Sequence, residues 1–126
     1  MSGPSSPPER RATIVDAIVR ARTDGKPVVF SAQGATVEYH DRTLRLELET
    51  SEADRLESLR STYPVIKPKQ PETRKAPDGV VVLSAVTDPK HAADFLDDLF
   101  LTVFGAAERY ELAVERRDDW EPMSSR

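Results

Sequence analysis

The chain has 126 residues, a formal net charge of −4 at pH 7, 38% hydrophobic and 32% charged residues, and no cysteine. This length suits one domain with its own core. The missing cysteines exclude disulfides, thiolate nucleophiles and cysteine-based zinc sites. The acidic balance argues against a surface devoted to nucleic acid. No apolar run approaches the roughly 20 residues that span a bilayer, and no secretory signal is recognisable, so we expect a cytoplasmic protein without a membrane partner.

The N-terminal part predicts a short disordered tail followed by a helix. Pro, Ser and Gly dominate residues 1–5, as in many mobile termini. Ser6 and Glu9 then have the spacing of a capping box, and Gly25 fits the left-handed position that ends a helix. Apolar side chains recur at helical intervals between them. We expect the buried side of this helix to consist of Ile14, Val15, Ile18, Val19 and Ala21.

Three runs after this helix predict an antiparallel meander with one solvated face. They cover residues 27–30, 36–40 and 43–49, and in the last of them leucines alternate strictly with charged residues. A second helix is expected from residue 50 to the residue before Pro64, because proline pushes its predecessor out of the helical region. Its expected capping pair is Ser51 and Asp54. Its expected buried side chains are Ala53, Leu56 and Leu59.

The second half of the chain predicts a strand, a helix and a terminal element that is either a helix or an edge strand. Residues 80–86 are continuously apolar, which indicates a central strand covered on both faces. Residues 88–104 form the most hydrophobic helical pattern and should lie across the sheet. Residues 106–117 fit either a helix or an edge strand, and Gly105 as a helix cap favours the strand. Residues 118–126 are expected to be a flexible tail.

This order predicts an α+β fold with an antiparallel sheet of about five strands and helices packed against it. The predicted order is α-β-β-β-α-β-β-α, with a possible final strand, in a single domain over residues 6–117. By element order alone, over most of the chain, it resembles the type III secretion chaperone-like α+β fold. No motif residue accompanies this resemblance, so it implies a fold and no particular activity. The preference for arginine over lysine is typical of GC-rich or salt-adapted, haloarchaeal-like organisms.

The segment 64–79 is rich in proline and locally basic. It carries four cationic side chains, which are Lys67, Lys69, Arg74 and Lys75. The favoured interpretation is a hairpin whose exposed strand is protected by proline and lysine against pairing with other chains. The alternatives are a stiff loop that binds an acidic protein partner, and, least favoured, a nucleic-acid contact, because no aromatic side chain lies inside the segment to stack on a base.

Ionisable residues gather on the helix predicted over residues 88–104. They are Asp88, His91, Asp94, Asp97 and Asp98. His91, Asp94 and Asp98 share one helical face and could hold a divalent metal, but we favour a solvated face with Asp88 as the helix cap. His40 stands beside Asp41 without a recognisable nucleophile motif. No phosphate-binding glycine motif occurs. We therefore assign no catalytic, cofactor or metal-binding residue.

Two apolar residues remain as candidates for partner contact. Leu101 gives the most hydrophobic helix an apolar side beyond the one that meets the sheet, which suggests a homodimer or partner surface. Trp120, among charged residues, is either an anchor for the tail or a docking residue, and the anchor is favoured. The sequence thus predicts a non-catalytic protein-binding or self-associating module. The alternative is a regulator that contacts nucleic acid or an acidic partner through residues 64–79.

Overall fold

The structure is a computed structural model that describes residues 3–69 and 79–117. Its elements follow the predicted order and include the possible final strand. Arg74, Lys75 and Trp120 lie outside the described residues. The helices are α1 (Pro7–Asp24), α2 (Thr50–Thr62) and α3 (Pro89–Asp98), which continues into the π-helical turn η1 (Leu99–Val103). The strands are β1 (Val28–Ala32), β2 (Ala35–His40), β3 (Thr43–Glu47), β4 (Lys67–Pro68), β5 (Val80–Ser84) and β6 (Ala113–Arg116).

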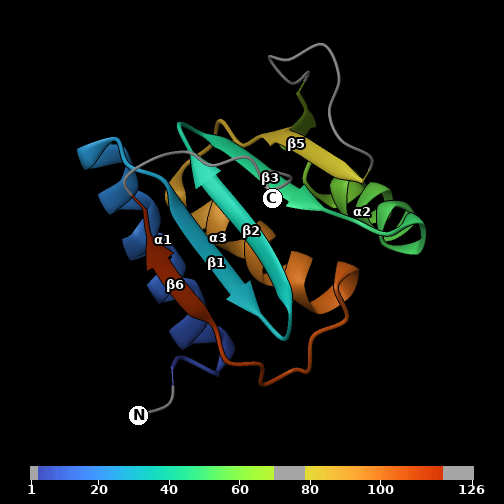
Figure 1. The fold of residues 1–126 in the computed structure, drawn as a ribbon, viewed down its shortest axis with the longest axis horizontal. Helices are drawn as coiled ribbons and strands as arrows, with labels where there is room; N and C mark the ends of the chain where they lie inside the picture. Colours follow the sequence, from blue (N-terminus) through green and yellow to red (C-terminus); the bar gives the residue numbers. More distant parts are fainter. Residues whose placement is uncertain (1–2, 70–78, 118–126) are drawn as a thin grey trace.

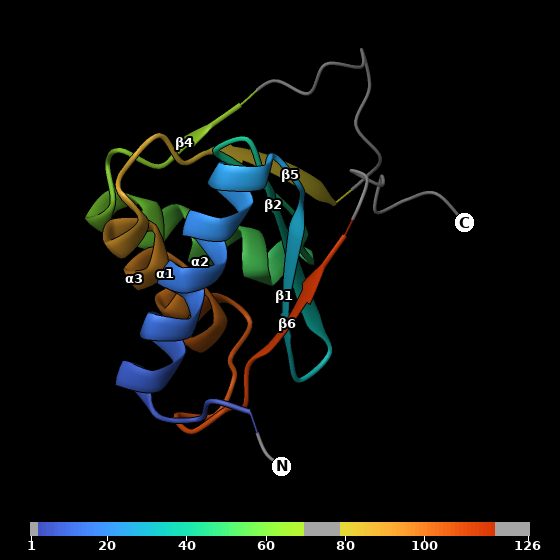
Figure 2. The ribbon, with the colours of Figure 1, turned by 90° about the vertical axis from the view of Figure 1, so that its left-hand side faces the viewer.

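The six strands form one antiparallel sheet in the order β4-β5-β3-β2-β1-β6 (Figure 1). All three helices lie on one side of this sheet (Figure 2). The fold is therefore α+β, as predicted, with a helical layer and a sheet layer. The meander of β1, β2 and β3 pairs as expected, because short turns at Gln33–Gly34 and Asp41–Arg42 join its strands.

The core lies between the two layers, and α3 with η1 runs through its middle. Leu96, Phe100 and Val103 are fully buried. Besides the sheet, α3 packs against α1, and η1 packs against α2. Leu101 is partly buried and packs against the same core. The apolar side chains on several sides of this helix thus find neighbours within the chain, because three elements surround it.

The first helix confirms its predicted caps and corrects part of its predicted buried side. Ser6 and Glu9 form the capping box, and Gly25 ends the helix at φ 72°. Val19, expected in the core, is 45% exposed, whereas Ala17 and Arg10 are buried. The helix is rotated relative to the prediction, so that its buried stripe begins one turn earlier, at a charged residue.

The second helix departs from its predicted cap. Its N-cap is Glu49, and the Glu52 side chain accepts a hydrogen bond from the Glu49 amide at 2.8 Å. Ser51 and Asp54 are not the capping pair. Ala53 is exposed, so its predicted burial is wrong, whereas Leu56 is buried as expected.

Two predictions about the last strands have opposite outcomes. The continuous apolar run was expected to form a strand covered on both faces, but β5 lies next to the edge strand β4 and no described helix covers its second face. Val80 and Val82 on that face are partly exposed. The final strand, by contrast, is confirmed: β6 pairs with β1 at the opposite edge of the sheet.

Candidate partner-binding surface

One face of the sheet has no described helix on it, and we call it the uncovered face. Because side chains alternate across a strand, its residues are those that alternate with core residues such as Phe30, Leu44 and Leu83. Strand pairing places the side chains of adjacent strands in rows across this face. The uncovered face comprises Val29, Ser31, Thr36, Glu38, His40, Thr43, Arg45, Glu47, Lys67, Val80, Val82, Ser84, Ala113 and Glu115.

The centre of the uncovered face is an ion pair between valines. Glu38 and Arg45 are directly opposite on β2 and β3, and the Arg45 Nε lies 2.9 Å from the Glu38 Oε1. Val29 stands beyond Glu38 in the same row, and Val82 stands beyond Arg45. The two charged side chains are only 7% and 12% exposed. Val29 is itself only 4% exposed, so the middle of this face presents a compensated ion pair beside the partly exposed Val82.

The end of the uncovered face near β4 is polar and cationic. Directly opposite residues on four adjacent strands form a row there, which is Lys67, Ser84, Thr43 and His40. Lys69 continues past β4 and donates its amide to the Val82 carbonyl at 2.8 Å. Its ammonium Nζ donates to the Thr43 Oγ1 at 3.0 Å, so this side chain extends over β5.

The structure thus brings together two of the four basic residues of the segment 64–79, for which a binding loop was the alternative to a protected hairpin. Lys67 and Lys69 are both exposed and both lie at this end of the uncovered face. The predicted hairpin is confirmed where the structure describes it, because β4 pairs antiparallel with β5. β4 has only two residues and one is Pro68, which matches the expected protection of an edge strand.

The predicted acidic face of α3 is divided among separate partners. Asp88 caps the helix as expected: its Oδ1 accepts from the His91 amide at 2.8 Å, which lowers the pKa of the Asp88 carboxyl. Asp94 lies 3.7 Å from the Arg11 guanidinium. Asp98 accepts a hydrogen bond from the Tyr63 hydroxyl. Among the described residues no group of three or more candidate ligands could hold a metal ion.

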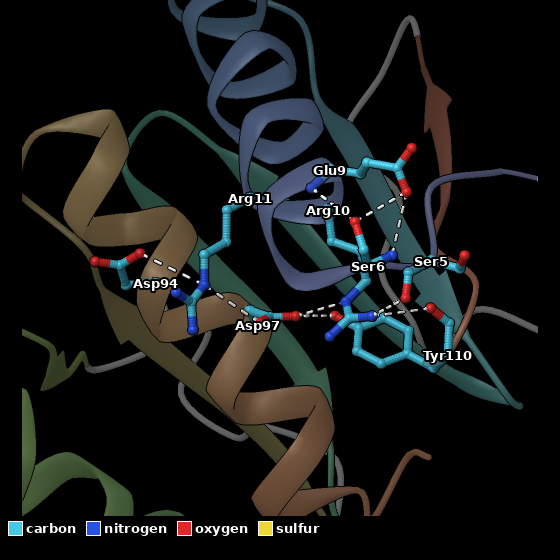
Figure 3. Close-up of polar contacts among 8 residues, drawn as sticks. All are labelled: Ser5, Ser6, Glu9, Arg10, Arg11, Asp94, Asp97 and Tyr110. Carbon is cyan, nitrogen blue, oxygen red and sulfur yellow. Dashed lines mark hydrogen bonds and ion pairs between the residues drawn. The ribbon is translucent and has the colours of Figure 1, made fainter. Parts of the chain in front are cut away.

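The fifth acid of this helix, Asp97, is fully buried, so the prediction of a solvated face is wrong for it. Its Oδ1 lies 2.8 Å from the Arg10 Nε and accepts from the Tyr110 hydroxyl, also at 2.8 Å (Figure 3). The Arg10 guanidinium carbon lies 3.9 Å from the centre of the Tyr110 ring. Burial and then the bond to Asp97 raise the pKa of the Tyr110 phenol.

This buried cluster joins parts of the chain that are distant in sequence. Arg10 Nη1 also donates to the Ser5 carbonyl at 2.6 Å and to the Tyr110 carbonyl at 3.2 Å. It therefore ties the N-terminal segment and α1 to α3 and to the segment that leads into β6. Arg10 and Asp97 have no exposed surface, so a substrate could not reach them. We assign the cluster to the stability of the fold.

The two histidines lie apart from each other and have different neighbours in the described part of the chain. His40 ends β2, and its Nε2 lies 3.2 Å from the carbonyl oxygen of Gly25. His91, in the first turn of α3, packs its ring against Tyr63 with 5.2 Å between the ring centres. The two histidines belong to different layers of the fold. No described helix is long and apolar enough to cross a membrane.

Comparisons with known proteins give one match. A family model described as a family of unknown function, DUF7975, matches residues 2–117. No curated protein and no solved structure matches the chain. The match covers every described residue and thus spans both layers of the fold.

Proposed function

Because the chain belongs to a family of unknown function, DUF7975, we propose its role from its own surface: it is a non-catalytic cytoplasmic protein-binding module. Its partner binds on the uncovered face. The observation that carries this proposal is the arrangement of the layers, in which all three helices lie on one side of a six-stranded sheet.

The composition of the uncovered face supports binding over mere solvation. A solvated sheet face needs only polar side chains, but here Val80 and Val82 are partly exposed beside a compensated ion pair. Protein interfaces combine an apolar centre, depleted of free charge, with a polar rim. Lys67 and Lys69 supply such a rim at the β4 edge.

The non-catalytic part of the proposal rests on how the candidate acids are used. Asp88 caps a helix, Asp94 pairs with an exposed arginine, and Asp97 and Asp98 bond to tyrosine hydroxyls. Each described acid of α3 thus has a partner that explains it structurally. A reaction centre would instead combine several such groups around one accessible point.

A different protein is favoured over a second copy of the chain. Self-association was expected through Leu101, yet Leu101 packs against the core of its own chain. We therefore place the partner contact on the uncovered face and assign Leu101 to packing.

The proposal can be tested by capturing the partner from an extract of the source organism with the immobilised chain and mapping the contact by hydrogen exchange. We expect protection of amides in β3 and β5, which lie under the uncovered face. Protection confined to α1 and α2 would contradict the proposal. Turnover of any substrate that disappears when His40 or His91 is replaced would contradict its non-catalytic part.

A further inference from the structure

The β4 end of the uncovered face combines hydrogen-bond donors from three adjacent strands. Lys67, Ser84 and Thr43 are directly opposite one another across β4, β5 and β3. Because neighbouring strands lie about 4.8 Å apart, the outer two backbones of this row are separated by about 10 Å. The Lys69 ammonium lies over the same row, since it reaches the Thr43 hydroxyl. Two lysine residues and two hydroxyl-bearing residues therefore lie along one row about 10 Å wide.

Some of these donors have no partner of their own. Neither the Lys67 ammonium nor the Ser84 hydroxyl makes a side-chain hydrogen bond or ion pair in residues 3–69 and 79–117. Lys69 uses one of its three N–H groups on Thr43, whose hydroxyl in turn donates to the Asp41 carbonyl at 3.2 Å. The row thus offers cationic donors that pair with no carboxylate among residues 3–69 and 79–117.

We propose that Lys67, Lys69, Ser84 and Thr43 form a binding site for a carboxylate group of a partner protein. This inference rests on the proposed function and gives the partner its chemistry: an acidic, extended segment that lies along the uncovered face. The ammonium groups of Lys67 and Lys69 donate to the two carboxylate oxygens, and the Ser84 hydroxyl donates between them. Charge-assisted hydrogen bonds of this kind are stronger than neutral ones.

The rest of the uncovered face favours a peptide carboxylate over nucleic-acid phosphates. The exposed Glu47 lies on the same face and would repel a continuous line of phosphates. The described residues of this face include no Phe, Tyr or Trp on which a base could stack. A single carboxylate needs only the row itself, and the valines beside it can receive an apolar neighbour in the partner segment.

The experiment is an NMR titration of the full chain with an octaglutamate peptide, with oligothymidine as the competing probe at the same salt concentration. We expect saturable amide shifts confined to the row of Lys67, Ser84 and Thr43 and to Lys69. The double variant Lys67→Ala/Lys69→Ala should bind the peptide about tenfold more weakly, because it loses two charge-assisted contacts. The matched control is Lys90→Ala/Arg20→Ala, which removes two exposed cations from the helical layer and should bind like the parent chain.

Four results would overturn the site: no saturable shift, shifts located on the helices, equal weakening in both double variants, or tighter binding of oligothymidine than of the peptide. The last result would assign the cationic row to nucleic acid. If the site fails but a captured partner still protects β3 and β5, the proposed function stands without it. If the peptide binds the row but the partner protects only the helices, the site stands and the proposed function fails.

Discussion

Replacement of Asp97 by alanine should be among the most damaging single changes in the chain. The substitution removes the carboxylate that compensates the Arg10 guanidinium, and both side chains are 0% exposed. Nη2 of Arg10 is buried without a hydrogen-bond partner even in the parent structure. Loss of Asp97 thus leaves a buried charge with contacts to backbone carbonyls and an aromatic ring only.

The expected size of this effect follows from the burial of the pair. Removal of one partner of a buried ion pair costs about 3–5 kcal/mol of unfolding free energy. The Tyr110 hydroxyl also loses its acceptor, which adds about 1 kcal/mol. A domain of this size has about 5–15 kcal/mol in total. At about 3–5 °C per kcal/mol, Tm should fall by at least about 10 °C.

The assay is urea unfolding followed by circular dichroism, with Asp94→Ala as the matched control. Asp94 is on the same helix, but its side chain is 35% exposed and lies 3.7 Å from Arg11, so its loss should cost less than about 1 kcal/mol. The double variant Arg10→Met/Asp97→Leu should recover most of the stability, because apolar residues can replace a buried ion pair. Equal costs for Asp97→Ala and Asp94→Ala would refute the reasoning.

Three further predictions concern single residues. Gly79→Ala should lower the unfolding free energy by about 1–3 kcal/mol in the same urea assay. Gly79 has φ 85°, and an added Cβ would lie 3.0 Å from the Leu48 carbonyl oxygen. An unchanged urea midpoint would contradict this and show that the turn relaxes. Asp88→Ala should lower Tm at neutral pH. Because the folded-state pKa of the Asp88 carboxyl is depressed, the difference in Tm from the parent chain should disappear as the pH falls through that pKa. A difference that persists in acid would exclude the charge as its cause. The pKa of the Tyr110 phenol is raised in the folded state. The neutral phenol therefore contributes to the free energy of unfolding below the unfolded-state pKa of about 10, and this contribution is lost as the pH rises above that value. In calorimetry, Tyr110→Phe should show a shallower alkaline loss of Tm than the parent chain, and parallel curves would contradict this.

The sequence predicts the fold well because its elements have strong local signals. The alternating leucines of residues 43–49 define β3, and the Ser6–Glu9 box defines the start of α1. Gly105 before an irregular segment correctly favours a terminal strand, β6. The alternating pattern, the capping box and the glycine cap each depend only on residues a few positions apart, so they can be recognised in the sequence. The resemblance to the type III secretion chaperone-like fold stays a prediction.

The sequence is less informative where tertiary contacts decide. Asp97 looks like one more acid on a polar helix, and only the position of Arg10 on α1 makes it a core residue. A signal was available, because Arg10 lies four residues before Ile14 and therefore continues the buried stripe. Similarly, the apolar run of β5 cannot reveal how many of its faces are covered, since this depends on the side of the sheet that the helices take.

The candidate site could be predicted only in part. The basic character of Lys67 and Lys69 is evident from the sequence. Their position beside Ser84 and Thr43 is not, because only the pairing of β4, β5 and β3 creates the row. Arg74, Lys75 and Trp120, predicted with them, lie outside the described residues and stay predictions.

The most direct test of the account is to measure how fast individual lysines are acetylated in the free chain and in the chain bound to its captured partner. Lys67 and Lys69 mark the β4 end of the uncovered face, and the exposed Lys90 marks the helical layer. We predict that the partner slows acetylation of Lys67 and Lys69 and leaves Lys90 unchanged. Slower acetylation of Lys90, with Lys67 and Lys69 reacting as in the free chain, would place the partner on the helices and contradict the account.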